Sequence, residues 1–96
     1  MMLPAVRTVR MRDQTWRIAK LEKGKARGIC EAPHVPGKAM DIPLHGGTIK
    51  DLDTILHESL HAALWDLDEE AVYDTAKDMA RILWRLGWRK AVEVRT

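Results

Sequence analysis

The second half of the chain carries two segments with the periodicity of amphipathic helices. Apolar residues recur three and four positions apart between residues 51 and 65, which predicts a helix with one broad apolar face. A second helix is predicted from Glu69 to Leu86, with Asp68 as its N-cap and Gly87 as its C-terminal stop. The predicted buried stripe of this second helix is Val72, Ala76, Met79, Leu83 and Leu86.

The first half alternates apolar and polar residues with a period of two. Residues 14–21 are predicted to form a half-buried strand, and residues 27–32 a second strand that returns beside it as a hairpin. Residues 38–44 read as a third strand, in which Pro43 either confines the strand to an edge or ends it. A weaker signal for extended structure covers residues 6–11.

The order of these segments predicts the fold class. Alternating segments followed by two helical segments indicate an α+β domain, with a small antiparallel sheet of about three strands packed on two helices. The length of 96 residues fits one domain spanning residues 1–96. Residues 92–94 alternate as well, which predicts a short strand or an ordered tail.

Composition indicates the cellular compartment in which the protein is expected. The single cysteine, Cys30, has no partner for an internal disulfide, which fits a reducing compartment. The beginning of the chain lacks the long apolar run of a signal peptide or a membrane span. We therefore expect a cytoplasmic protein, and a small domain without disulfides is often stabilised by a metal.

Charge is distributed unevenly although the net charge is only +2. Residues 1–30 carry 8 basic and 2 acidic side chains, residues 31–80 carry 3 basic and 11 acidic, and residues 81–96 carry 5 basic and 1 acidic. The acidic middle of the chain favours a cation. The basic ends are consistent with solvated faces and, less directly, with a nucleic-acid or acidic partner.

The pattern His57-Glu58-x-x-His61 lies inside the first predicted helix. Histidines four residues apart share a helical face and can bind one ion. This spacing is typical of a helix that binds zinc and places a glutamate beside the metal as general base. Glu58 is therefore expected to be catalytic, and the two histidines to be ligands.

The third zinc ligand must come from outside this pattern. A catalytic zinc usually takes three protein ligands and one water. Leu67 stands where a third histidine of the metzincin pattern would be required, which excludes that class. Glu69 is favoured, because it shares the predicted buried face of the second helix. Glu70, Asp66 and Asp68 are the alternatives.

Two runs of residues carry a resemblance to a known family. The segments 54–62 and 67–72, with Ala76 beyond them, resemble small phage and prophage metallopeptidase-like zincins. More distantly, they resemble the peptidases that cleave phage repressors, of the ImmA/IrrE type. The resemblance covers about residues 38–86. It implies a hairpin and an edge strand before the motif helix, and a metal-binding glutamate from the next helix.

The expected chemistry is hydrolysis of a peptide bond. Zn²⁺ would be bound by His57, His61 and Glu69, with a water in the remaining position. Glu58 would take a proton from that water and later deliver it to the leaving amine. Tyr73, one turn after Glu69, is a candidate to stabilise the oxyanion. The expected partner is a peptide or protein substrate.

The sequence also predicts a mode of substrate binding, and it leaves one competing function open. The predicted strand at residues 38–44 could bind an extended peptide by strand addition. The alternative is a zinc-stabilised binding module without proteolytic activity, which contacts a partner protein or nucleic acid through its basic ends. The residues that favour this alternative are Arg81, Arg85, Arg89 and Lys90, of which the arginines are four apart on one helical side.

Overall fold

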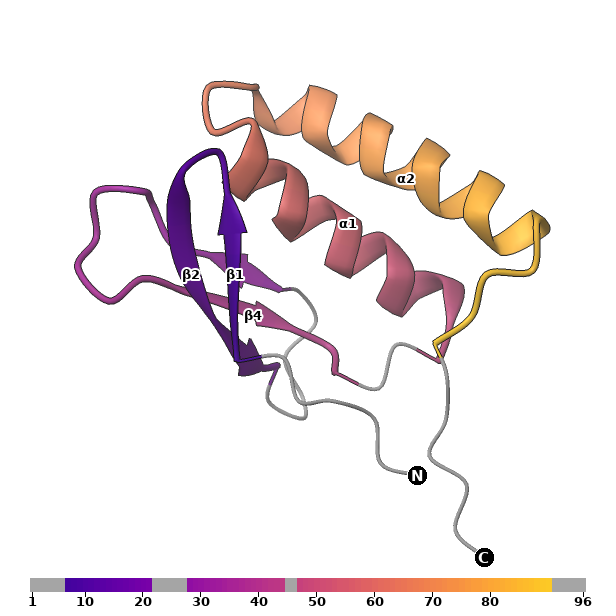
Figure 1. Ribbon diagram of the computed structural model, residues 1–96. Coiled ribbons are helices and arrows are strands. Elements are labelled where there is room, and N and C mark those ends of the chain that lie inside the picture. The colour runs from indigo at the N-terminus through magenta and orange to yellow at the C-terminus, as the bar shows by residue number, and fades with distance from the viewer. Residues whose placement is uncertain (1–6, 22–27, 45–46, 91–96) are drawn as a thin grey trace, which may run out of the picture.

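The computed structural model describes residues 7–21, 28–44 and 47–90, which form a sheet and two helices (Figure 1). The strands are β1 (Thr8–Met11), β2 (Gln14–Lys20), β3 (Ile29–Cys30) and β4 (Ala39–Ile42). The helices are α1 (Ile49–Ala63) and α2 (Glu69–Arg85). The predicted α+β class is confirmed, although the sheet has four strands instead of about three. The extended segment predicted at residues 92–94 lies outside the described residues.

The pairing of the strands differs from the predicted antiparallel sheet. The order is β1-β2-β4-β3, and β2 runs parallel to β4, so the sheet is mixed. The predicted hairpin between residues 14–21 and 27–32 is wrong, because β2 forms its hairpin with β1, and β3 pairs with β4. Arg12 and Asp13 close the β1–β2 hairpin with φ values of 50° and 64°. Positive φ at both central residues is the geometry of a tight two-residue turn, but without glycine it leaves a weak sequence signal.

β4 lies inside the sheet, between β2 and β3. The prediction that residues 38–44 form an edge strand is therefore wrong, and this strand has no free edge for a peptide. Pro43 follows the last residue of β4, so the proline ends the strand, which was the other predicted effect. Ala39 and Met40 of β4 are buried, as expected for a strand with a neighbour on each side.

The core between the sheet and α1 forms around Trp16 of β2. Trp16, Met40 and Ala62 are fully buried and in mutual contact. The indole Nε1 of Trp16 donates a hydrogen bond to the backbone oxygen of Glu31 at 2.9 Å, so the polar atom of this large side chain is satisfied. This packing fixes α1 across one face of the sheet.

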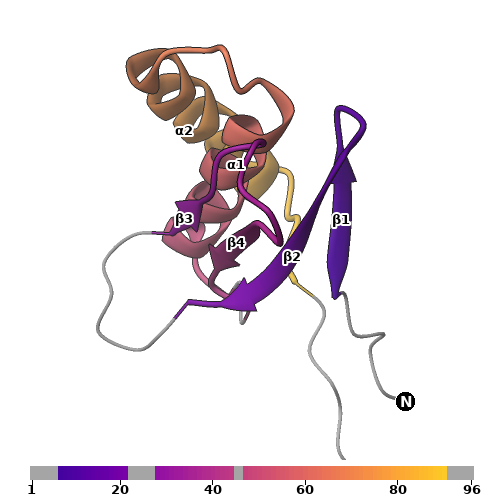
Figure 2. The same cartoon turned by 90° about the vertical axis from the view of Figure 1, so that its left-hand side faces the viewer.

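α2 forms a third layer. Figures 1 and 2 show α1 between the sheet and α2, and among the described elements α2 contacts only α1. Val72 and Ala76 face α1 as predicted, and Ala80 is buried with them. The predicted burial of Met79 and Leu86 is wrong, since these side chains are 38% and 69% exposed.

Polar caps define where the helices begin. Thr48 and Asp51 form a capping box at the N-terminus of α1, which starts two residues before the predicted position. Asp68 accepts a hydrogen bond from the backbone N–H of Ala71 at 2.7 Å, which confirms its predicted role as N-cap of α2. The cap makes Glu69 the first residue of α2 and directs its side chain back toward α1. Gly87 ends α2 at a φ of 92°, also as predicted.

Candidate metal centre

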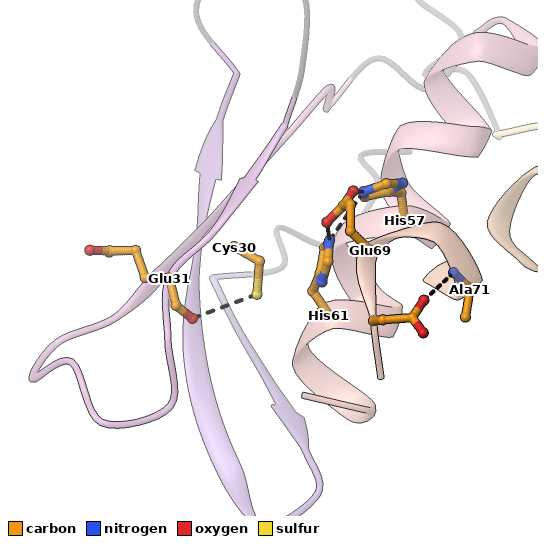
Figure 3. Close-up of polar contacts among 7 residues, drawn as sticks. Cys30, Glu31, His57, His61, Glu69 and Ala71 are labelled. Atoms are coloured by element: carbon orange, nitrogen blue, oxygen red, sulfur yellow. Dashed lines mark hydrogen bonds and ion pairs between the residues drawn. The ribbon is translucent and has the colours of Figure 1, made fainter. Parts of the chain in front are cut away.

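His57 and His61 project from the same face of α1, one turn apart (Figure 3). Their Nε2 atoms are 3.1 Å from each other, and the ring centroids are 4.8 Å apart. Both side chains are about one-fifth exposed, at 19% and 20%. The two nitrogen atoms therefore point at one small volume that solvent can enter.

Glu69 closes this volume from the first turn of α2. Its Oε1 lies 2.9 Å from Nε2 of His57, and its Oε2 lies 2.9 Å from Nε2 of His61. Figure 3 shows the carboxylate lying across the two rings. Among the described residues, these three form the one cluster of metal-binding side chains, and Glu70 is not part of it. The structure thus brings together the three residues that the sequence favoured as ligands.

The donor set fits zinc. Imidazole nitrogen and carboxylate oxygen are zinc ligands, with bond lengths of about 2.0–2.2 Å. Two such atoms on a tetrahedral ion lie about 3.3 Å apart. The separations of 2.9–3.1 Å found here need to widen by only a few tenths of an ångström. Three protein ligands also leave a fourth position free for water or substrate.

Glu58 is the buried acidic residue of the site. It is 5% exposed and makes no hydrogen bond with another described residue. Every side-chain oxygen in the described residues that is fully shielded from solvent has a hydrogen-bond partner. The Glu58 carboxylate has no such partner, so its oxygens must be reached by solvent, and they are reached through the cleft that Glu58 lines. Burial raises the pKa of Glu58; the charges of Glu69 and Asp41 also raise it, and His57 opposes the rise. A buried carboxylate with a raised pKa is suited to accept and return a proton.

The cluster lies in an open cleft of about 730 Å³. One wall is β3 with the residue before it, and the floor is the histidine face of α1. The sequence reasoning missed Lys50, Thr54 and Trp65 as residues that line the cleft. Lys50 and Thr54 lie seven and three positions before His57 on the same face of α1, so the helical spacing was available as a signal. Trp65 lies in the turn after α1. The other missed wall residues come from β3, whose position depends on tertiary pairing.

Gly28 allows β3 to approach α1 closely. A Cβ atom at this position would lie 2.7 Å from the backbone oxygen of Asp41, 2.8 Å from Cγ of Glu58 and 2.9 Å from Cγ2 of Thr54. The backbone of Gly28 therefore occupies space against which the methylene groups of Glu58 pack. This contact restrains the position of the Glu58 side chain.

We expect Gly28→Ala to destabilise the protein by about 1–3 kcal/mol, as for other overpacked sites. For a domain of this size, each kcal/mol corresponds to a fall of roughly 4–8 °C in Tm. The matched control is Gly47→Ala, because a Cβ at Gly47 meets nothing within 4 Å. Equal melting temperatures for the two variants would show that the close approach at Gly28 has no energetic consequence.

The remaining candidate residues have different surroundings. Tyr73 lines the cleft, is 50% exposed and has its ring centroid 6.5 Å from that of His57. Cys30 also lines the cleft, but burial raises the pKa of its thiol to about 12, with Glu58 and Glu31 adding to the rise. A thiol held in its protonated form is a poor zinc ligand. His34 is exposed in a turn, and His45 lies outside the described residues.

Comparison of the chain with protein-family models, curated proteins and solved structures finds no match. The functional assignment therefore depends on the chemistry and geometry of the cleft.

Proposed function

We propose that the protein is a zinc-dependent peptidase whose centre is formed by His57, His61 and Glu69, with Glu58 as general base. The observation that carries the proposal is the buried Glu58 carboxylate, which opens to the same cleft as the three convergent ligands. A site that serves only to stabilise a fold has no need of a buried acid next to its ligands. Removing a carboxylate from water costs free energy, and buried groups with a shifted pKa cluster at functional sites.

Each part of the site has a proposed role in the hydrolysis of a peptide bond. A bound zinc supplies Lewis-acid polarisation of the scissile carbonyl and makes water more acidic. Glu58 accepts the proton of the attacking water and then delivers it to the nitrogen of the leaving amine, which restores the carboxylate. The walls of β3 and α1 hold the peptide beside this carboxylate. The hydroxyl of Tyr73 is proposed to donate a hydrogen bond to the oxyanion.

An extended peptide is the proposed substrate, and β3 is its proposed binding edge. β4 is paired on both sides, whereas β3 is the last strand of the sheet and lines the cleft. A peptide that adds to the outer edge of β3 would cross the histidine face of α1. From Lys50 to the end of α1 at Ala63 this face is about 20 Å long at 1.5 Å per residue. That length matches about six extended residues.

The compartment is proposed to be the cytoplasm. Within the described ranges, no helix is long and apolar enough to cross a membrane. The free thiol of Cys30 is consistent with a reducing environment.

The test is digestion of a peptide library, read by mass spectrometry. The full chain is compared in three states: loaded with zinc, depleted by a chelator, and reloaded with zinc. We expect cleavage in the first and third states only. A chain that binds zinc and gains stability from it, but cleaves no peptide or unfolded protein, would instead be a zinc-stabilised binding module.

A further inference from the structure

α2 carries an apolar row that has no partner in the described part of the chain. Met79, Ile82 and Leu86 are 38%, 58% and 69% exposed. Thr75, also exposed, continues the row, so the spacing is four, three and four residues along one face of the helix. The residues of the row lie about 80–140° around the helix from Glu69, at 100° per residue. The row therefore lies on a different face of α2 from the metal cluster.

The core of the described residues is small for a domain that stands alone. Four of its seven buried hydrophobic residues are alanines. Ala76 and Ala80 let α2 approach α1 closely, but they bury little apolar surface. Small domains of this kind usually gain stability from a metal, a disulfide or association with another chain. Covering the apolar row would supply the missing burial.

We propose that this row is the interface of a two-fold symmetric dimer, in which α2 packs antiparallel against α2 of a second copy. The spacing of four, three and four residues is the same whether the row is followed from its N-terminal or its C-terminal end. A two-fold axis beside residues 80 and 81 therefore sets Met79 against Ile82 of the second copy, and Thr75 against Leu86. Such self-complementarity is what an isologous interface requires.

The charges beside the row select the antiparallel arrangement. Asp78 and Arg85 precede Met79 and Leu86 and lie on the flank of the row away from α1. Antiparallel packing brings Asp78 of each copy near Arg85 of the other. Parallel packing would instead set this charged flank against the opposite flank of the second copy, where Leu83 offers no charge. Asp78 is 75% exposed, and its ion pair with Arg81 of the same helix has a long N–O distance of 3.4 Å. Arg85 forms no ion pair among the described residues. Helix-dipole effects act only in the first and last turns, so they do not explain the position of Asp78.

Analytical ultracentrifugation of the full chain over a dilution series tests the dimer. We expect a particle of two 11.0 kDa chains that dissociates on dilution. Ile82→Lys should raise the dissociation constant by about tenfold or more while the circular dichroism spectrum is unchanged. The control is Leu64→Lys, which changes a 43% exposed residue at the other end of the helical hairpin and should leave the dimer intact.

A charge exchange tests the orientation. Asp78→Arg should weaken the dimer, because it faces Arg85 of the second copy, and adding Arg85→Asp in the same chain should restore it. A wild-type chain that is monomeric at every concentration overturns the proposal and leaves the row to another occupant. Equal dissociation constants for the wild type and Ile82→Lys, or no restoration by the second charge change, also overturn it.

Discussion

Glu58→Gln is expected to abolish hydrolysis while zinc binding is nearly unchanged. Glutamine keeps the size of the side chain but cannot accept a proton from water. General base catalysis typically contributes about 10²–10⁴-fold, so kcat should fall by that factor. The ligand atoms of His57, His61 and Glu69 are within 4.8 Å of one another without any contribution from Glu58, so the zinc site should persist. The measurements are kcat on a cleaved peptide and the Kd for zinc.

The same substitution has an expected effect on stability that separates catalysis from folding. Burial raises the pKa of Glu58 in the folded protein above its value in the unfolded chain. The contribution of this group to stability is then present below the unfolded pKa and is lost as pH rises through the folded pKa. At neutral pH, metal-free Glu58→Gln should therefore melt at the same temperature as the wild type, or higher. A lower Tm together with lost zinc binding would mean that Glu58 is a structural prop or a ligand.

Glu69→Ala is expected to have the largest effect on zinc binding among the acidic residues of α2. Even the loss of a group that only orients a ligand weakens metal binding by about 10–100-fold. Loss of the ligand itself should weaken it by at least about 100-fold. Because zinc at 1,000 times its Kd stabilises a folded protein by about 4 kcal/mol, most of the thermal shift on adding zinc should disappear as well. Zinc titration and thermal melting measure the two effects.

Glu70→Ala is the matched control for Glu69→Ala. Glu70 is the next residue of α2, is exposed and lies outside the cluster, so its loss should leave the Kd for zinc within error of the wild type. The opposite ranking, with zinc binding lost in Glu70→Ala and kept in Glu69→Ala, would mean that α2 presents a different face to α1 in solution.

The convergence of the three candidate ligands was predictable from the sequence to the extent that it depends on helix geometry. His57 and His61 are paired by their spacing alone. Glu69 was favoured because it lies three residues before Val72 and seven before Ala76, on the face of α2 that packs on α1. The sequence also allowed the α+β class to be derived from the change in periodicity between the two halves of the chain.

What could not be predicted depends on long-range pairing. Residues 14–21 and 27–32 look like neighbours in a hairpin, but β4 lies between them in space. The turn at Arg12 and Asp13, which gives β2 its actual hairpin partner, contains no glycine to mark it. The role of Gly28 is visible only when Asp41, Thr54 and Glu58 are placed around it. Met79 and Leu86 fit a helical stripe, but they lie about 60° and 80° around α2 from Ala76 at 100° per residue. The contact with α1 is centred on Val72, Ala76 and Ala80, so both side chains stay exposed.

X-ray absorption at the zinc edge of the zinc-loaded chain tests the central assignment most directly. The account predicts one zinc per chain with only nitrogen and oxygen neighbours at about 2.0–2.2 Å, two of them imidazoles. The same spectrum should be lost in His57→Ala. A sulfur neighbour at about 2.3 Å would place Cys30 on the metal and fill the position that hydrolysis needs, which would contradict the account. So would a chain that retains no zinc.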